Sequence, residues 1–283
     1  MKRILVTGAN KGIGKALCEK LLSDRPDTFV YLCSRSIERG QDSLEDIIKN
    51  VGGDASTRIE VLQMDVSDDT SVTTAAATLT AKIGQQSLYA IVNNAGIGFG
   101  SYKMNDVLQT NTYGPHRVTE AFLPMLHRTG RIVNITSASG PNFVAKMTAA
   151  GIDVSILLNP SSTWTEIDSF IENVKTIVPD IEATPIDVYG LSKACVNTYT
   201  MQTARAHPDL VVNSLTPGFI DTDLTKGYGA SLPPSAGTTV ILYCLFGEDV
   251  GTGRYYGSDA KRSPLDRYRG PGEPPYNPES EQT

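Results

Sequence analysis

A tyrosine and a lysine stand four residues apart in the segment Tyr189-Gly-Leu-Ser-Lys193. On a helix this spacing places both side chains on one face. A free tyrosine has a pKa near ~10, too high for efficient proton exchange near neutral pH, and a neighbouring ammonium group favours the phenolate and lowers that pKa. The pair can therefore supply an acid for proton transfer. Because so short a motif also occurs by chance, it needs a supporting context.

The first part of that context is a glycine-rich turn near the N-terminus. Residues 3–6 form an apolar run that predicts a strand, and residues 15–22 have helical spacing. Between them lies Thr7-Gly-Ala-Asn-Lys-Gly-Ile-Gly14, and this order aims the N-terminal amides of a helix at a phosphate. We expect a tight turn at Gly8, close backbone approach to a pyrophosphate at Gly12, and close packing of helix on strand at Gly14.

Basic residues follow the second predicted strand, residues 28–33. At this place in dinucleotide-binding folds an acidic residue binds the ribose 2′-hydroxyl of NAD, whereas an arginine binds the 2′-phosphate of NADP. The sequence has Arg35 here, with Arg39 one turn later and Lys11 in the glycine-rich turn. Three cations that converge on one dianion favour NADPH. The alternative is that these are solvated surface charges.

Strands and helices continue to alternate along the chain. Further strands are predicted at 59–63, 88–92, 131–136, 211–215 and 253–256, and helices at 70–83, 104–126 and 235–246. This order predicts the α/β class, with a doubly wound parallel sheet of the Rossmann type in three α/β/α layers. Ligands bind such sheets at the carboxyl ends of the strands. The residues that follow predicted strand ends are Gly8, Arg35, Asp65, Asn93 and Ser137.

Three segments are expected to shape the site. Gly114-Pro115 should bend or interrupt the helix predicted at 104–126. In Asn93-Asn-Ala-Gly96 the asparagines can join neighbouring strand ends, while Ala95 and Gly96 leave room for the adenine ribose. The loop at 226–236 is rich in Gly, Ser and Pro and should cover the substrate as a mobile lid.

The composition excludes several functional classes. The 283 residues carry a net charge of −6, which argues against a protein that binds nucleic acid through its phosphate backbone. No apolar run approaches the ~20 residues that cross a bilayer, so no membrane association is expected. The four cysteines lack Cys-x-x-Cys pairing and the three histidines lack a metal-binding arrangement. We expect a metal-free protein in a reducing compartment, the cytoplasm.

Together the motifs resemble the short-chain dehydrogenase/reductase family over about residues 3–256: the Thr-Gly-x-x-x-Gly-x-Gly turn, Asn-Asn-Ala-Gly, a serine, Tyr-x-x-x-Lys and Pro217-Gly218. The chain looks most like the monomeric carbonyl reductases of this family. Ser137 and Tyr189 are 52 positions apart, whereas most members place them about a dozen apart. The resemblance therefore implies a helical insertion at about 141–186, before the tyrosine.

The resemblance implies reduction of an aldehyde, ketone or quinone with NADPH. Ser137 would hydrogen-bond the substrate carbonyl, Tyr189 would protonate its oxygen, and Lys193 would lower the pKa of Tyr189 and hold the nicotinamide ribose. Asn111 would kink its helix and anchor a water that passes protons to Lys193. Ser139 is an alternative to Ser137, and for Asn111 the alternative is a helix-kink residue alone.

The resemblance also assigns binding residues. The predicted cofactor-binding set is Gly8, Asn10, Lys11, Gly12, Ile13, Gly14, Arg35, Arg39, Asp65, Val66, Asn93, Ala95, Gly96, Tyr189, Lys193, Pro217, Gly218 and Thr222. The predicted substrate-binding set is Ser137, Tyr189, Phe99, Phe143 and Phe219, of which the phenylalanines are apolar lining or, alternatively, core. For Thr222 the alternative is a helix cap.

We therefore expect one catalytic domain over residues 1–256 and a C-terminal tail, 257–283, that wraps the surface. Because the insertion lies beside the Tyr189 helix, through which many relatives assemble, a monomer is expected. Two other functions remain open. One is a specialised alcohol or ketone dehydrogenase of the same branch, acting on a steroid, terpenoid or alkaloid. The other is an NADP-binding sensor without catalysis.

Overall fold

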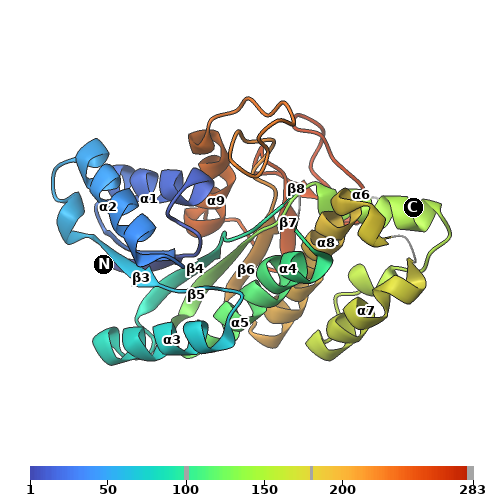
Figure 1. Ribbon diagram of the computed structural model, residues 1–283, viewed down its shortest axis with the longest axis horizontal. Helices are drawn as coiled ribbons and strands as arrows, with labels where there is room; N and C mark the ends of the chain where they lie inside the picture. The colour runs from blue at the N-terminus through green and yellow to red at the C-terminus, as the bar shows by residue number, and fades with distance from the viewer. Residues whose placement is uncertain (99–101, 179–180, 279–283) are drawn as a thin grey trace.

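One twisted sheet runs through the molecule (Figure 1). The computed structural model describes residues 1–98, 102–178 and 181–278. Within these residues the sheet has eight strands in the order β3-β2-β1-β4-β5-β6-β7-β8. The strands are β1 Lys2–Val6, β2 Thr28–Ser34, β3 Ile59–Gln63, β4 Leu88–Asn93, β5 Leu126–Ile135, β6 Val211–Leu215, β7 Arg254–Tyr256 and β8 Arg262–Ser263. All neighbours pair in parallel except β7 and β8, which pair antiparallel.

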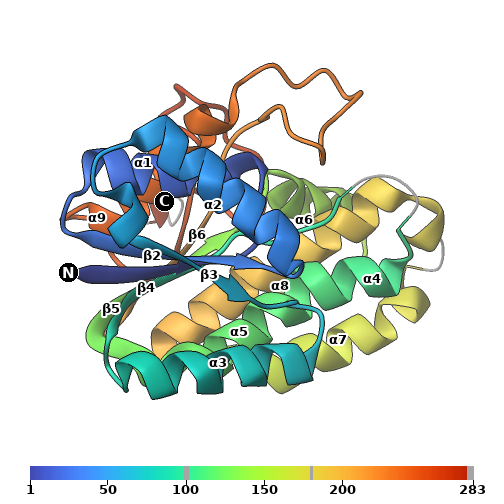
Figure 2. The same cartoon turned by 60° about the vertical axis from the view of Figure 1, so that its left-hand side comes forward.

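Helices cover both faces of the sheet (Figure 2). They are α1 Gly12–Asp24, α2 Ile37–Val51, α3 Asp69–Ile83, α4 Met104–Leu108, α5 Gly114–Phe122, α6 Ser139–Ala149, α7 Trp164–Ile177, α8 Pro185–Ala206 and α9 Thr238–Phe246. The helices α1, α2 and α9 lie on one face, and α3, α5 and α8 lie on the other. The predicted doubly wound, three-layer α/β/α architecture is confirmed.

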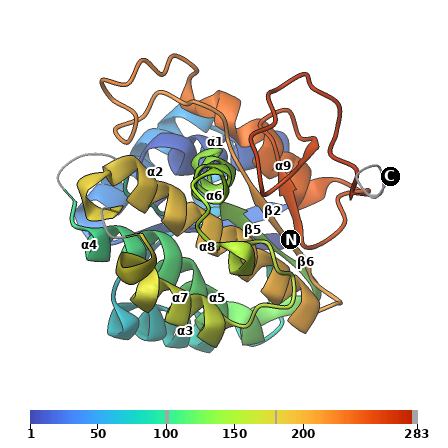
Figure 3. The same ribbon diagram turned by 90° about the vertical axis from the view of Figure 1, so that its right-hand side faces the viewer.

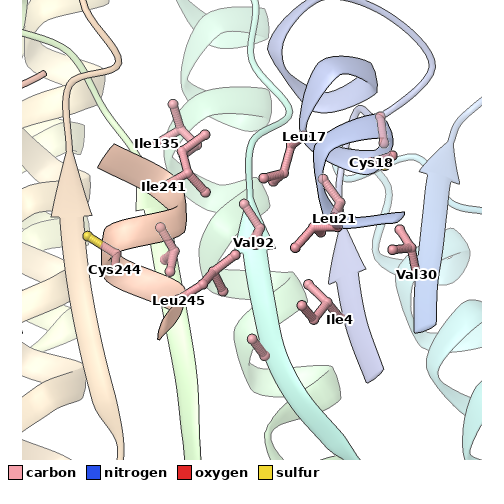
Figure 4. Packing of buried hydrophobic residues seen from close by; sticks show 14 of the residues in the cluster. Ile4, Leu17, Cys18, Leu21, Val30, Val92, Ile135, Ile241, Cys244 and Leu245 are labelled. Carbon is pink, nitrogen blue, oxygen red and sulfur yellow. The ribbon is translucent and has the colours of Figure 1, made fainter. Parts of the chain in front are cut away.

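Alternating residues of each central strand supply the two cores. In β1, Ile4 and Val6 face the α1/α9 side, whereas Leu5 belongs to the cluster under α3 and α5. Figure 4 shows Leu21 of α1 and Leu245 of α9 packing over Ile4 and its neighbours. Each such side chain contributes roughly 1.5–3 kcal/mol by leaving water. Burial of both faces fixes the strand ends, and with them the loops that carry the site.

The helix expected at 104–126 is interrupted, as the Gly114-Pro115 pair predicts. A π-helical turn, Gln109–Tyr113, separates α4 from α5. Pro115 has no N–H, so the Asn111 carbonyl loses its α-helical donor. Gly114 fits because a Cβ there would come within 3.1 Å of the Val66 side chain. Asn111 therefore lies in a π-helical turn and not within a regular α-helix.

The insertion before Tyr189 forms a helical layer beside α8 (Figure 3). Its helix α7 starts at a capping box in which Thr163 and Glu166 bond reciprocally. Trp164 then stacks on His116 of α5, with ring centroids 3.7 Å apart. The predicted insertion is thus helical, but α6 begins already at Ser139, directly after the fifth strand.

The segment after Tyr256 does more than follow the surface. It forms β8, which pairs with β7 at the sheet edge. The sequence predicted no strand here because two residues are too few to show alternation. Residues 257–278 are consequently tied to the edge of the sheet next to the carboxyl end of β7.

Candidate active site

A cavity of about 1060 Å³ opens at the carboxyl ends of the parallel strands. Most of the predicted site residues line this cavity, although they come from segments far apart in the chain. The predicted residues that line it are Gly8, Asn10, Lys11, Gly12, Ile13, Arg35, Arg39, Asp65, Val66, Ala95, Gly96, Ser137, Tyr189, Lys193, Pro217, Gly218, Phe219 and Thr222. Four predicted residues lie behind the lining: Gly14, Asn93, Asn111 and Phe143. Phe99 lies outside the described residues.

Gly14 and Asn93 hold the floor of the cavity together. A Cβ on Gly14 would lie 2.7 Å from the Gly8 carbonyl oxygen, so α1 packs as close to the first strand as expected. The buried Asn93 amide donates to Asn134 Oδ1 at 2.8 Å and to Thr119 Oγ1 at 3.2 Å, which places it away from the cavity. The neighbouring Asn94 lines the cavity instead.

The structure corrects two expectations about covering side chains. Phe143 is buried in the hydrophobic cluster of the insertion, because it lies on the face of α6 that packs against Gly190 of α8. Within the predicted lid, 226–236, only Pro234 lines the cavity. The loop closes on itself where the Asp221 N–H donates to the Leu232 carbonyl at 2.8 Å. Residues 221–225 line the cavity, whereas residues 226–233 do not.

The glycine-rich turn has the shape that a pyrophosphate requires. Gly8 and Gly12 adopt φ of 61° and 57°, which favour glycine. A Cβ on Gly8 would also lie 2.8 Å from Ala95 Cα. The N-terminus of α1 starts at Gly12, so its free N–H groups point toward the cavity that the turn lines. These residues fit a dinucleotide.

Cations surround this end of the cavity. In the part of the chain that the structure describes, the guanidinium groups of Arg35 and Arg39 have no ion-pair partner, because Glu38 bonds to Ser36 instead. Both arginines are exposed at the cavity lining. Lys11 Nζ lies 2.6 Å from Asp223 Oδ2 in an exposed ion pair. Two available guanidinium groups fit a phosphate dianion at the end of β2.

The other end of the cavity holds Ser137, Tyr189 and Lys193. The hydroxyls of Ser137 and Tyr189 share a hydrogen bond. Lys193 Nζ lies 5.5 Å from the Tyr189 ring centroid and donates to the Ile135 carbonyl at 3.0 Å. Ser139 also lines the cavity, and its N–H donates to Ser137 Oγ at 3.2 Å. The bond to Tyr189 favours Ser137 over Ser139 as the polar partner of a substrate oxygen.

Burial controls the acid–base properties of this group. Desolvation raises the pKa of Tyr189 to about 12, partly offset by the hydrogen bond with Ser137. Desolvation also lowers the pKa of Lys193 from 10.5 to about 8. The expected lowering of the Tyr189 pKa by the lysine is therefore not seen in the protein alone. Tyr189 is fully protonated at neutral pH and is therefore an acid rather than a phenolate.

Asn111 lies behind the cavity wall, on the far side of Gly96. Its amide donates to the Ile97 carbonyl at 2.7 Å and its Oδ1 accepts from the Ile97 N–H at 2.8 Å. A Cβ on Gly96 would lie 3.4 Å from Asn111 Oδ1 and 3.5 Å from Lys193 Nζ. Because Gly96 has no side chain, a space remains between the Asn111 amide and the Lys193 amine. The water relay through Asn111 stays a prediction, and this gap supplies a place for it.

Several lining residues escaped the sequence reasoning. They are Asn94, Tyr102, Asp106, Asn142, Ser258, Tyr268, Arg269 and Pro271. Asn94 could have been found from strand alternation, since it follows the last residue of β4. Ser258 follows the strand predicted at 253–256, whereas Tyr268, Arg269 and Pro271 follow no strand that the pattern reveals.

Replacing Lys193 by methionine should stabilise the fold at pH 7 and remove turnover. Below about pH 8 the folded protein holds a buried ammonium, which is unfavourable. Between that pH and the unfolded value of 10.5, the unfolded chain binds a proton that the folded chain lacks, so wild-type stability rises with pH through this window. Urea unfolding at pH 7 should show a gain on the order of 1–3 kcal/mol, which shrinks towards pH 10.5.

The matched control is the exposed Lys20, which pairs with Asp24 on α1. Lys20→Met should change the free energy of unfolding by less than ~1 kcal/mol at either pH. A Lys193→Met protein that is less stable than wild type at pH 7 would contradict the assignment of a destabilising buried charge.

Within the described residues, no helix is long and apolar enough to cross a membrane. The same residues contain no cluster of three or more His, Cys, Asp or Glu side chains that could hold a metal ion. The site is a strand-end cavity, with the glycine-rich turn and two arginines at one end and Ser137, Tyr189 and Lys193 at the other.

Comparison with known proteins gives this arrangement its family. Residues 2–150 match the family profile described as short chain dehydrogenase. The chain is 31% identical over 290 residues to a (+)-neomenthol dehydrogenase of Arabidopsis thaliana, covering 89% of this chain and 94% of that protein. It is 29% identical over 272 residues to carbonyl reductase [NADPH] 3 of Mus musculus, covering 87% and 91%.

Among solved structures, salutaridine reductase from Papaver somniferum superposes with a TM-score of 0.76 at 25% identity, covering 90% of this chain and 99% of that one. The resemblance first drawn from five short motifs thus extends over most of the chain and its fold. This chain belongs to the short-chain dehydrogenase/reductase family.

Proposed function

We propose that the protein reduces a carbonyl group of a small molecule to an alcohol, with NADPH as its cofactor. The observation that carries the proposal is the cavity itself, which joins the two available arginines at the end of β2 to the Ser137–Tyr189–Lys193 group. Relatives named carbonyl reductase [NADPH] and salutaridine reductase support the same activity.

The cofactor would be held by the glycine-rich turn, by Arg35 and Arg39 at its 2′-phosphate, and by Lys193 at the nicotinamide ribose. When bound, NADPH supplies the hydride that reduces the carbonyl carbon. The hydroxyls of Ser137 and Tyr189 share a hydrogen bond, so one substrate oxygen can accept hydrogen bonds from both. As negative charge develops on that oxygen, Tyr189 donates its proton.

Reprotonation of Tyr189 then falls to Lys193 and the polar groups behind it. With a pKa of about 8, Lys193 can release and regain a proton near neutral pH. Asn111 bonds to the N–H and the carbonyl of Ile97, and a Cβ on Gly96 would lie within 3.5 Å of both Asn111 Oδ1 and Lys193 Nζ. The proton thus reaches the substrate oxygen from a buried side-chain group rather than from bulk water.

The test is NADPH oxidation by the purified protein against quinones, α-dicarbonyls, aromatic aldehydes and cyclic ketones, repeated with NADH. We expect turnover of at least one class, with kcat/KM at least about tenfold higher for NADPH than for NADH. Tight NADPH binding without turnover of any carbonyl would instead favour the non-catalytic sensor.

A second candidate is a specialised dehydrogenase or ketone reductase of the same branch. The relatives named neomenthol dehydrogenase and salutaridine reductase favour it. Ser137, Tyr189 and Lys193 serve oxidation and reduction equally, so the catalytic group does not separate the two candidates. A strong preference for one terpenoid, steroid or alkaloid ketone over simple aldehydes would select the specialised enzyme.

We also propose a monomer. The insertion helix α7 packs against α5 and α8: Trp164 stacks on His116 of α5 and lies edge-to-face with Tyr199 of α8. Relatives that assemble through these two helices need this face uncovered. Light scattering should give a mass near 30.4 kDa. A stable tetramer would refute the proposal.

The cytoplasm remains the proposed location. Cys18, Cys33, Cys195 and Cys244 are all free and buried. Burial raises the pKa of each thiol, which keeps them as unreactive apolar groups. Free cysteines of this kind suit a reducing compartment.

A further inference from the structure

The C-terminal segment forms one wall of the cavity. Ser258, Tyr268, Arg269 and Pro271 all line it, although the sequence predicted a surface tail. A Cβ on Gly218 would lie 3.3 Å from Ser258 Cβ, so the segment starts directly against the Pro217-Gly218 turn. The tail therefore adds its side chains to the cavity next to Phe219.

This wall stands at the catalytic end of the cavity. The tail follows β7, which pairs with β6, and β6 pairs with β5, the strand that runs into Ser137. Arg35 and Arg39 belong instead to the segment after β2, at the opposite end of the sheet order from β7. Side chains of the tail thus border the space for the substrate rather than the phosphate-binding end.

Arg269 fixes the shape of the wall from inside. Its buried guanidinium ion-pairs with Asp259 and donates to Ser263 Oγ at 2.9 Å and to the Glu273 carbonyl at 2.8 Å. Gly257 provides the space that the guanidinium of Arg269 occupies, since a Cβ at Gly257 would lie 2.5 Å from Arg269 Nη2. One side chain thereby joins both ends of the 257–273 segment and holds Tyr268 in place.

Aromatic rings gather around the same cavity. Tyr102, Phe219 and Tyr268 line it and are 53%, 50% and 51% exposed. Of the large exposed aromatic side chains in the described residues, only Tyr228 does not line it. Exposed apolar rings concentrated at one cavity indicate a binding surface for a ligand with an apolar body.

We infer that the 257–273 segment is a built part of the substrate site, and that the ring of Tyr268 selects carbonyl compounds with a flat aromatic or polycyclic body over small aliphatic ones. The inference rests on the proposed function. Arg269 and Asp259 act as positioning residues that hold the ring against the cavity.

The test compares an aryl or polycyclic ketone with a short aliphatic aldehyde as substrates of the full-length protein. Tyr268→Ala should lower kcat/KM for the ring ketone about 10- to 100-fold. The same variant should leave kcat/KM for the aliphatic aldehyde and the Kd for NADPH within about twofold. Tyr268→Phe keeps the ring and should restore the wild-type preference.

Tyr228→Ala is the matched control, because Tyr228 is as exposed as Tyr268 but does not line the cavity. It should leave the preference unchanged. Asp259→Asn should loosen the wall: it should lower selectivity for the ring ketone and speed tryptic cleavage at Lys261, Arg262 or Arg267, a readout independent of activity.

Equal losses on both substrates after Tyr268→Ala, or no loss on either, would overturn the inference while leaving the proposed function intact. Absence of turnover in the wild-type protein would instead remove the proposed function itself. Unchanged tryptic cleavage in Asp259→Asn would show that the ion pair does not hold the wall.

Discussion

Replacing Tyr189 with phenylalanine should lower kcat about 10²- to 10⁴-fold and leave the Kd for NADPH within about twofold. The substitution keeps the buried ring, and Lys193 Nζ lies 5.5 Å from the centroid of that ring. It removes only the hydroxyl that shares a hydrogen bond with Ser137. The loss should therefore appear in the chemical step, measured as single-turnover NADPH oxidation, and not in cofactor binding, measured by fluorescence.

Tyr199 provides the control for that experiment. It lies on the same helix, α8, is equally buried, and its hydroxyl donates to Glu120 at 3.2 Å, away from the cavity. Tyr199→Phe should retain kcat within about twofold and lose on the order of 1 kcal/mol of stability. If Tyr189→Phe retained a tenth or more of wild-type kcat, another group would have to be the acid.

Replacing Arg35 and Arg39 together with alanine should lower kcat/KM for NADPH about 10²-fold or more and leave kcat/KM for NADH almost unchanged. A charge-assisted hydrogen bond contributes about 1.5–3 kcal/mol, and NADH lacks the phosphate that would accept it. Neither guanidinium has an ion-pair partner among the described residues, so their removal should disturb little else. Steady-state kinetics with both cofactors measures the effect.

Arg128 is the matched control, since it is an exposed arginine, loosely paired with Asp209 at 3.7 Å, and does not line the cavity. Arg128→Ala should not change the ratio between the two cofactors. Added salt should lower the ratio of kcat/KM for NADPH to kcat/KM for NADH in the wild type, because salt screens the attraction between exposed arginines and the phosphate. A parallel loss for NADPH and NADH in the double variant would mean that the arginines support the fold rather than bind a phosphate.

The sequence predicted the buried strands well, because their apolar runs stop at turn residues. Residues 59–63 and 211–215 were predicted with the bounds that β3 and β6 have. The fifth strand starts at Leu126 rather than at the predicted Arg131. Its residues 127–129 are exposed, Gly130 follows them, and the register against β4 shifts between Leu88 and Ala90, so no apolar pattern marks this part.

The site was predictable where strand ends bring residues together, and less so elsewhere. Asn93 and Asn94 are adjacent, and successive side chains of a strand point to opposite faces of the sheet. This alternation alone decides that Asn93 bonds to Asn134 of β5 while Asn94 lines the cavity. Phe143 reads as a lining aromatic, but the sequence does not reveal that α6 turns this face onto α8. The roles assigned to Asn111, Ser137, Tyr189 and Lys193 stay predictions, and the variants at Tyr189 and Lys193 test two of them.

The ion pair between Asp259 and Arg269 joins two positions of the same short segment. The ion pair that holds the cavity wall therefore lies within the 257–273 segment itself and does not involve the glycine-rich turn or the two arginines after β2. Over evolutionary time, mutations between those two anchor points could exchange one accepted metabolite for another while hydride chemistry continued undisturbed. Such changes would fall between Asp259 and Arg269 and not in the glycine-rich turn or the Ser137–Tyr189–Lys193 group.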